Sequence, residues 1–303
     1  MTRTVWLASY PKSGNTWFRM LIANLSATDR PVDINDLPER GGIASAREPF
    51  DRLTLIASGL LTHEETDCLR PRVYRELRRG TADDEYDAPE KPQPVRFVKC
   101  HDAYTYTAQG VPLLGGMDGA DGVVLVVRDP RDVAPSLANH SRTTIDAAID
   151  FMNDEKAAFC GRTDCQANQL RQQLPGWSGH IESWLAQTGL PVHLVRYEDM
   201  KADTAGVLRR ALAFARRAAS EADIARAVAF ADFKELKRQE GAQGFREAPP
   251  RISAGFFRRG ETGTWRDELT AQQVRRIEDA HAPMMQRLGY ALSTAAAELV
   301  DAE

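Results

Sequence analysis

The stretch "VWLASYPKSGNTWFRML" at residues 5–21 joins a buried strand, a polar turn and the start of a helix. Its first residues, VWLAS at 5–9, are apolar, as in a strand that is covered on both faces. A helical pattern begins at Thr16 and continues to residue 27. Between the two lies one lysine, Lys12, among small and polar residues. The stretch therefore predicts a cation and free backbone N–H groups beyond the carboxyl end of a strand.

This polar turn, the 10–16 loop, has the chemistry of an anion site. In an open α/β sheet, ligands bind beyond the carboxyl ends of the strands, often at a helix N-terminus that presents N–H groups to an anion. The loop lacks the first glycine of the GxxxxGK[ST] phosphate loop, because Tyr10 and Pro11 precede Lys12. The alternative is an ordinary helix cap, in which Ser13 or Asn15 satisfies the first N–H groups and Lys12 is solvated.

The rest of the chain alternates strands with helices. Apolar runs resembling 5–9 occur at 95–100, 123–128 and 192–197. Helical patterns lie at 16–27, 132–142, 177–188, 204–217 and 270–288. This alternation predicts an α/β fold whose central, mostly parallel sheet is flanked by helices. We expect a single domain over 1–303, with an insert or lid at 31–94 that contains helices at about 49–61 and 63–80.

Composition excludes several classes of function. The chain has 303 residues, of which 43% are hydrophobic, and a net charge of −4, which argues against a general nucleic-acid binder. Its four cysteines do not form a zinc-ligand array and are expected to be reduced thiols. Neither a secretory signal nor a membrane-length apolar run is visible, so we expect no membrane partner and a cytoplasmic location.

Four segments together resemble the cytosolic-type sulfotransferases, which use 3′-phosphoadenosine 5′-phosphosulfate (PAPS). "SYPKSGNTW" is similar to that family's T-Y-P-K-S-G-T-T-W loop. "VVRDPRDVAPSLANH" is similar to its 3′-phosphate segment, and "VRYEDMKAD" to its Y-E-D-M-K strand end. "FFRRGETGTWRDELT" resembles its R-K-G-x-x-G-D-W-K-x-x-F-T segment. The chain is identified as a bacterial member of the family, because the matches occur in order from residue 8 to 270.

The resemblance implies a P-loop-like domain, PAPS as donor and adenosine 3′,5′-bisphosphate (PAP) as product. It assigns the 5′-phosphosulfate to Lys12, Ser13, Gly14, Asn15, Thr16 and Trp17. It assigns the 3′-phosphate to Arg128, Ser136, Arg258, Arg259 and Gly260, where guanidinium groups match phosphate geometry. Trp17 and Phe233 are expected to flank the adenine, with the Tyr197 hydroxyl nearby. No metal is expected, because the transferred group carries less charge than a γ-phosphate and a lysine can cover the leaving group.

The implied reaction is an in-line transfer of a sulfuryl group to a hydroxyl of a small molecule. Negative charge accumulates on the leaving phosphate, where a preorganised Lys12 would stabilise the transition state. The family's catalytic Lys-x-His matches Lys99 and His101, which the alternation of a strand places on one face. His101 is the expected general base, since an imidazole titrates near neutrality. Of the other histidines, His140 could line the site, His180 is expected to pack, and His63, His193 and His281 to be structural or exposed.

Several positions depart from the family pattern. Asn15 replaces a threonine, and Thr264 replaces the aspartate of G-D-W. Ala231 stands where a hydroxyl residue usually lies near adenine, so one contact to the base is in doubt. AQQVRR, which follows "RDELT", does not reproduce the dimer segment of animal members, and the oligomeric state stays open. The added length between Lys12 and His101 falls in 31–94.

The same residues argue against two other functions. A P-loop kinase needs the missing glycine and an acidic, magnesium-binding strand end, whereas the 123–128 run ends in Arg128. A non-catalytic nucleotide-binding relative would not need Lys12, Lys99 and His101. The acceptor is not determined by the sequence, which leaves phenols, alcohols, amines and carbohydrates open. Residues 31–94, 140–176 and 239–256 are expected to shape its pocket.

Overall fold

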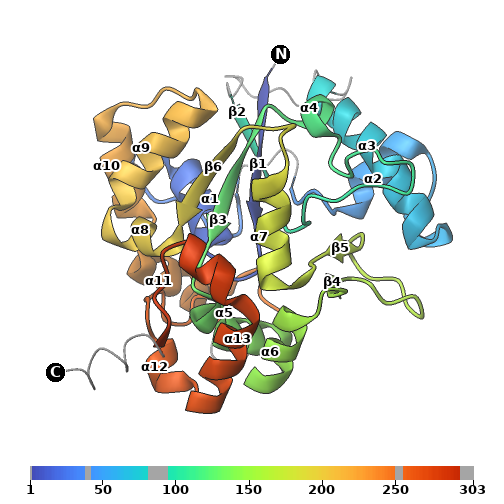
Figure 1. Ribbon diagram of the computed structural model, residues 1–303. Helices are drawn as coiled ribbons and strands as arrows, with labels where there is room; N and C mark the ends of the chain where they lie inside the picture. Colours follow the sequence, from blue (N-terminus) through green and yellow to red (C-terminus); the bar gives the residue numbers. More distant parts are fainter. Residues whose placement is uncertain (1, 38–41, 81–94, 250–254, 294–303) are drawn as a thin grey trace.

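The computed structural model describes residues 2–37, 42–80, 95–249 and 255–293. Its centre is a four-stranded sheet in the order β2-β1-β3-β6, with all neighbours parallel (Figure 1). The strands are β1 (Arg3–Ser9), β2 (Val95–Cys100), β3 (Gly122–Val127) and β6 (Val192–Arg196). The predicted parallel α/β sheet is confirmed, and each apolar run forms its strand within two residues of the expected bounds.

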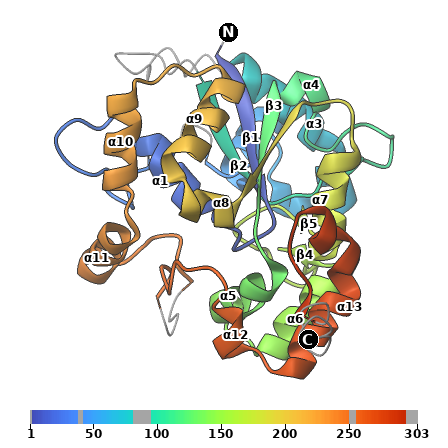
Figure 2. The ribbon, with the colours of Figure 1, turned by 60° about the vertical axis from the view of Figure 1, so that its left-hand side comes forward.

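Each face of the sheet packs against its own helices, because successive side chains of a buried strand point to opposite faces. Val124 and Val126 of β3 pack into one core, and Val123 and Leu125 into the other. Figure 2 shows one layer beside α1 and the other around α7. The first layer contains α1 (Asn15–Asn24), α8 (Tyr197–Ala202), α9 (Thr204–Ala215), α10 (Glu221–Phe230) and α11 (Phe233–Gln243). The second contains α5 (Pro130–Ser141), α6 (Ile145–Asn153), α7 (Gly176–Ala186) and α13 (Ala271–Arg287).

The carboxyl ends of the four strands meet at one edge of the sheet, as parallel pairing requires. Ala8 lies opposite both Cys100 and Leu125, so the residues that follow them, Ser9 and His101, come together. The 10–16 loop, the residue after β3 and the start of α8 emerge at the same edge. In Figure 1 this edge points downward, toward α5 and the short hairpin of β4 (Ala158–Phe159) and β5 (Gln172–Gln173).

The described part of the 31–94 segment packs more closely than its composition predicts. It forms α2 (Arg47–Thr54), a 3-10 turn (Ser58–Leu60) and α3 (His63–Arg79). Beyond β2, α4 (Gly116–Gly119) follows outside this segment. The Pro, Gly and Asp content of 31–94 predicts little apolar surface to bury, but Phe50, Val73 and Tyr74 are buried, so this prediction is wrong for these helices. The acidic run at 83–90 lies outside the described residues.

A buried ion pair ties α3 to the strand that precedes His101. The guanidinium of Arg70 donates to both carboxylate oxygens of Asp102 at 3.0 and 2.7 Å, and its Nε donates to Tyr74 Oη at 2.8 Å. Both charged side chains are fully buried, so removing either partner would leave an uncompensated charge. The residue next to His101 is thereby anchored to α3.

Among the described helices, none combines the length and apolar character needed to cross a bilayer.

Candidate active site

A cavity of about 830 Å³ opens at the carboxyl edge of the sheet. This volume lies in the range of small-molecule sites, and the residues around it come from the ends of all four strands. It brings together nearly all the predicted site residues: Lys12, Gly14, Asn15, Thr16, Trp17, Lys99, His101, Arg128, Ser136, Tyr197, Phe233, Arg258, Arg259 and Gly260. Ser13 is not among the lining residues, and its side chain is fully buried beneath the loop.

The shape of the 10–16 loop depends on Gly14. Its φ of 103° is a left-handed conformation that favours glycine. A Cβ atom at this position would lie 2.5 Å from Cδ2 of Tyr197, so a side chain is also excluded by contact. Gly14 is the N-cap of α1, and the cap has no side-chain hydrogen bond. The alternative of a capping Ser13 or Asn15 is therefore wrong.

Asn15 folds the loop back onto the strand. Its Nδ2 donates to the carbonyl of Leu7 at 2.9 Å and to Ser9 Oγ at 3.1 Å. Both hydrogen bonds of the amide nitrogen are thus made within the protein, while Oδ1 is buried without a partner among the described residues. The replacement of the family's threonine by Asn15 adds a brace between the loop and β1.

Lys12 lies in the cavity with few groups to neutralise it. Its Nζ stands 3.9 Å from the centre of the Phe256 ring, a cation–π contact. Burial, together with the neighbouring charges of Lys99, Arg128 and Arg258, lowers its pKa to about 7. A site that holds a lysine at such a cost in solvation is suited to an anion, which would restore its charge.

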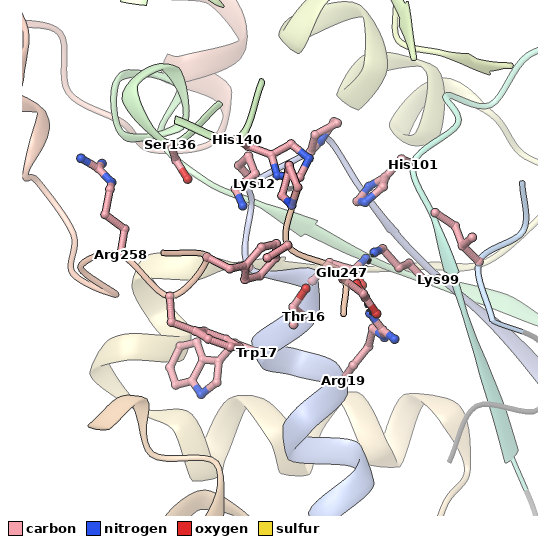
Figure 3. A pocket seen from close by; sticks show the side chains of 18 of the residues that line it. Lys12, Thr16, Trp17, Arg19, Lys99, His101, Ser136, His140, Glu247 and Arg258 are labelled. Atoms are coloured by element: carbon pink, nitrogen blue, oxygen red, sulfur yellow. Dashed lines mark hydrogen bonds and ion pairs between the residues drawn. The ribbon is translucent and has the colours of Figure 1, made fainter. Parts of the chain in front are cut away.

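His101 presents a free ring nitrogen to the cavity (Figure 3). Its Nδ1 lies 2.8 Å from the carbonyl oxygen of Ser9, and a carbonyl can only accept, so Nδ1 carries the hydrogen. Nε2 keeps its lone pair, with no hydrogen-bond partner in the described part of the chain. Burial first, and then the charge of Lys99, lowers the pKa of His101 well below its usual value. The imidazole is therefore neutral at pH 7 and able to accept a proton.

His180 packs against the backbone of His101, as predicted. Its Nε2 donates to the carbonyl oxygen of His101 at 3.1 Å, and its ring packs edge-on against Tyr10. His140 does line the cavity, where burial and the charges of Lys12 and Lys99 lower its pKa to about 4. The remaining three bond or stack outside the cavity: His63 to Gly161, His193 to Phe214, and His281 to Ser178.

Lys99 has a partner that the sequence analysis missed. Its Nζ lies 2.9 Å from Oε2 of Glu247, and the same carboxylate accepts from Arg19 at 2.7 and 3.0 Å. Figure 3 shows Glu247 between the two cations. Although burial opposes ionisation, Lys99 and Arg19 hold the pKa of Glu247 at about 2. The arrangement fixes the ammonium group beside His101. Glu247 lies far along the chain, in the 239–256 region that was expected to shape the pocket, but nothing in its local pattern marks it as a partner of Lys99.

A second cationic group borders the cavity beside the 10–16 loop, where Arg128 Nη1 donates to the carbonyl of Lys12 at 3.4 Å. Arg128 donates from Nη2 to the carbonyl of Glu261 at 2.9 Å and lies 4.4 Å from the centre of the Tyr197 ring. Its Nε is buried with no partner among the described residues. Arg258 pairs with Glu268, and Arg259 lies 3.7 Å from the same carboxylate with 42% of its side chain exposed.

Asp132 holds the 258–265 segment beside Arg128. It accepts from the backbone N–H groups of Gly263 at 2.7 Å and Trp265 at 3.0 Å, and from the hydroxyl of Thr264 at 3.2 Å. Thr264 therefore serves the turn as a donor where the family carries aspartate. At Gly260, whose φ is 66°, a Cβ would lie 2.3 Å from the Phe233 ring. The two arginine-bearing segments form one wall.

Three aromatic side chains, Trp17, Tyr197 and Phe233, form a further wall of the cavity. The indole of Trp17 donates to the backbone carbonyl of Ala231 at 2.9 Å and meets Tyr197 edge-on, with ring centres 5.7 Å apart. Ala231 thus contributes its carbonyl to the position of Trp17, and its methyl group is buried. Phe233 borders the cavity next to this pair.

This fold places a lysine-bearing loop, a neutral histidine and several arginines around one cavity. The family model "Sulfotransferase domain" matches residues 2–289. The chain therefore belongs to the sulfotransferase family, which confirms the predicted family, the P-loop-like fold class and the enzyme class.

Curated relatives span most of the chain at low identity. Sulfotransferase 1A1 of Canis lupus familiaris is 25% identical over 294 residues, covering 95% of this chain and 85% of the relative. Luciferin sulfotransferase of Photinus pyralis is 22% identical over 280 residues, covering 90% of this chain and 69% of the relative. The solved structure of mouse sulfotransferase SULT7A1 complexed with PAP is 18% identical, with a TM-score of 0.54 over 93% of this chain and 84% of that chain. The structural likeness shows a shared fold.

Proposed function

We propose that this enzyme moves a sulfuryl group from PAPS to a hydroxyl of a small molecule, a phenol or an alcohol, with His101 as the general base. The observation that carries the proposal is the neutral imidazole of His101, whose Nε2 faces the same cavity as the ammonium of Lys12. A proton acceptor beside an anion site is what sulfuryl transfer to a hydroxyl requires.

The cavity residues fit a donor with anionic groups at both ends. Lys12 is desolvated, and Arg128 Nε is buried with no partner among the described residues, so two cationic side chains that border the cavity can serve a ligand. The 10–16 loop would hold the 5′-phosphosulfate. Arg128, Ser136, Arg258, Arg259 and Gly260 would hold the 3′-phosphate, and Trp17, Tyr197 and Phe233 would border the adenine. When bound, PAPS supplies an activated sulfuryl group on a phosphate leaving group.

Each of three charged or titratable side chains has its own role in the proposed reaction. His101 accepts the hydroxyl proton of the acceptor at Nε2 and becomes an imidazolium. The Ser9 carbonyl stabilises this cation by accepting a hydrogen bond from Nδ1–H. Lys12 stabilises the negative charge that develops on the leaving phosphate. Lys99, fixed by Glu247, stabilises the sulfuryl oxygens or the acceptor oxygen.

The first test is a comparison of PAP with ATP. PAP should raise the melting temperature, because a ligand at 100 times its Kd stabilises the native state by about 2.7 kcal/mol. ATP at the same concentration should do so far less, since it lacks the 3′-phosphate that Arg128 and Arg259 would bind. The measurement is a thermal shift titration of both nucleotides. Equal stabilisation by the two would contradict the assignment of the 3′-phosphate wall.

We also propose that the 31–94 insert covers the acceptor side of the cavity. Gly42 and Ile43 of the insert line the cavity, and Ile43 bridges to Lys99 in parallel register, so this part of the insert lies near His101. Amides at 42–47 should exchange more slowly with deuterium when PAP and a phenol bind together. The packed α3 is the internal control, since its amides should be slow in every state. Unchanged exchange at 42–47 would make the insert a static structural element.

A further inference from the structure

Two glutamine side chains form part of the cavity wall on the side of β4 and β5. Gln172 lies in β5 opposite Phe159 of β4, and Gln169 bridges to Ala46 in antiparallel register. The backbone N–H of Leu170 donates to the carbonyl of Ser45 at 2.8 Å. Both glutamines line the cavity that contains His101, next to Ile43 and Phe159. The backbone pairing on both sides makes this wall rigid.

The two carboxamides are hydrogen-bonded to each other, and within the described part of the chain each has one polar end without a partner. Nε2 of Gln172 donates to Oε1 of Gln169 at 3.0 Å, and the hydroxyl of Ser45 donates to the same oxygen at 2.9 Å. Gln172 is only 2% exposed, and among the described residues its Oε1 has no donor. If the oxygen and nitrogen of both amides are exchanged, one donor and one acceptor still remain. The pair therefore offers a ligand one of each.

The strand that carries Gln172 is anchored to the chain next to the base. The backbone N–H of Ala103, two residues beyond His101, donates to the carbonyl of Gln173 at 2.9 Å. The position of the amide pair relative to His101 is thus set by direct main-chain contact. A group bound by the pair would fix which hydroxyl of an acceptor reaches Nε2.

We propose that the Gln169–Gln172 amide pair binds a second hydroxyl of the acceptor, so that the preferred acceptors are diols, polyols or polyphenols. The inference rests on the proposed sulfotransferase function and specifies its substrate class. A hydroxyl both donates and accepts, which matches the two free ends of the pair. A carboxylate would leave the acceptor end without a donor, and an ammonium group would leave the donor end without an acceptor. An acceptor that lacks the second hydroxyl leaves a buried carbonyl unpaired.

The experiment compares acceptors in pairs that differ by one hydroxyl. The probes are 4-ethylphenol with 4-(2-hydroxyethyl)phenol, phenol with each benzenediol, and cyclohexanol with each cyclohexanediol. Sulfate transfer from labelled PAPS gives kcat/KM for each compound. A matched hydroxyl should raise kcat/KM by roughly 5- to 150-fold over its partner in at least one pair, the range expected for one buried hydrogen bond.

Two variants show whether the amide pair is responsible. Gln172→Met keeps the length of the side chain but removes its polar atoms. It should lower kcat/KM for the compound with the second hydroxyl, so that the ratio of kcat/KM within each pair falls to about one. Gln173→Met is the matched control, since Gln173 is the next residue of β5 and its Nε2 donates to Asp67 at 3.2 Å instead of lining the cavity. It should keep the wild-type preference. Retained PAP stabilisation in both variants shows that they are folded.

The outcomes separate this inference from the general function. Equal kcat/KM within every pair, or a preference that survives Gln172→Met, overturns the assignment of the amide pair. Lack of transfer to every probe, while PAP still raises the melting temperature, also overturns it. Failure of PAP to stabilise the wild-type protein would instead contradict the proposed use of PAPS.

Discussion

Replacing His101 with alanine should lower kcat by about 10²–10⁴-fold, the usual contribution of a general base. The variant removes the Nε2 lone pair that faces the cavity, whereas the walls assigned to the nucleotide keep their residues. PAP should therefore raise the melting temperature of the variant as much as that of the wild type. Steady-state sulfate transfer and thermal shift measured on the same preparation test both parts.

His140→Ala is the control for this experiment, because His140 is the other histidine that lines the cavity. It should keep most of the wild-type rate. A His101→Ala enzyme with more than a tenth of the wild-type kcat would place the base elsewhere, and a large loss in His140→Ala would point to that residue.

Since the pKa of His101 lies well below its usual value, the imidazole stays neutral on mild acidification. The wild-type kcat/KM should thus show no acid limb from this group near pH 6.5.

Replacing Lys12 with methionine should lower kcat by about 10²–10³-fold, as expected when one preorganised donor to a developing anion is removed. Methionine preserves most of the volume of the side chain beside Phe256, so the loss reports on the charge. Unlike His101→Ala, this variant should also bind PAP more weakly, because the ammonium would contact the nucleotide. Sulfate transfer and PAP titration give the two effects separately. An unchanged rate would show that Lys12 does not touch the leaving group.

The pKa of Lys12 predicts a further difference between wild type and variant. In the free enzyme it is about 7, and a bound anion favours the protonated lysine, so the pKa rises in the complex. PAP binding then takes up a proton above pH 7, and its affinity should fall by up to about tenfold per pH unit between pH 7 and the pKa of the complex. Calorimetric titration at pH 7, 8 and 9 measures the slope. Lys12→Met should be flat over this range, and an equal slope in both proteins would assign the proton to another group.

Much of the fold and cavity could be predicted because the informative patterns are local. Each of the four strands is an apolar run bounded by polar residues, and parallel pairing places all their carboxyl ends at one edge. The loop after β1, the histidine after β2 and the arginine after β3 had to meet there. Some short elements, such as α6, α11 and the β4–β5 hairpin, were not predicted. The two helices of 31–94 were predicted, but their burial was not. Their burial depends on the Arg70–Asp102 pair and on the surface that the helices cover.

The sequence alone determined the class of sheet, the family and most of the residues around the cavity, since hydrophobic periodicity and contiguous motifs are properties of neighbouring residues. The tertiary structure decided the electrostatics. Glu247 meets Lys99 and Arg19 only after folding brings together segments separated by 148 and 228 residues. Lys12 owes its low pKa to burial and to cations on other elements, and the Gln169–Gln172 pair owes its unpaired ends to the β4–β5 wall. Charge interactions and desolvation depend on distance and burial in three dimensions, which no local pattern records.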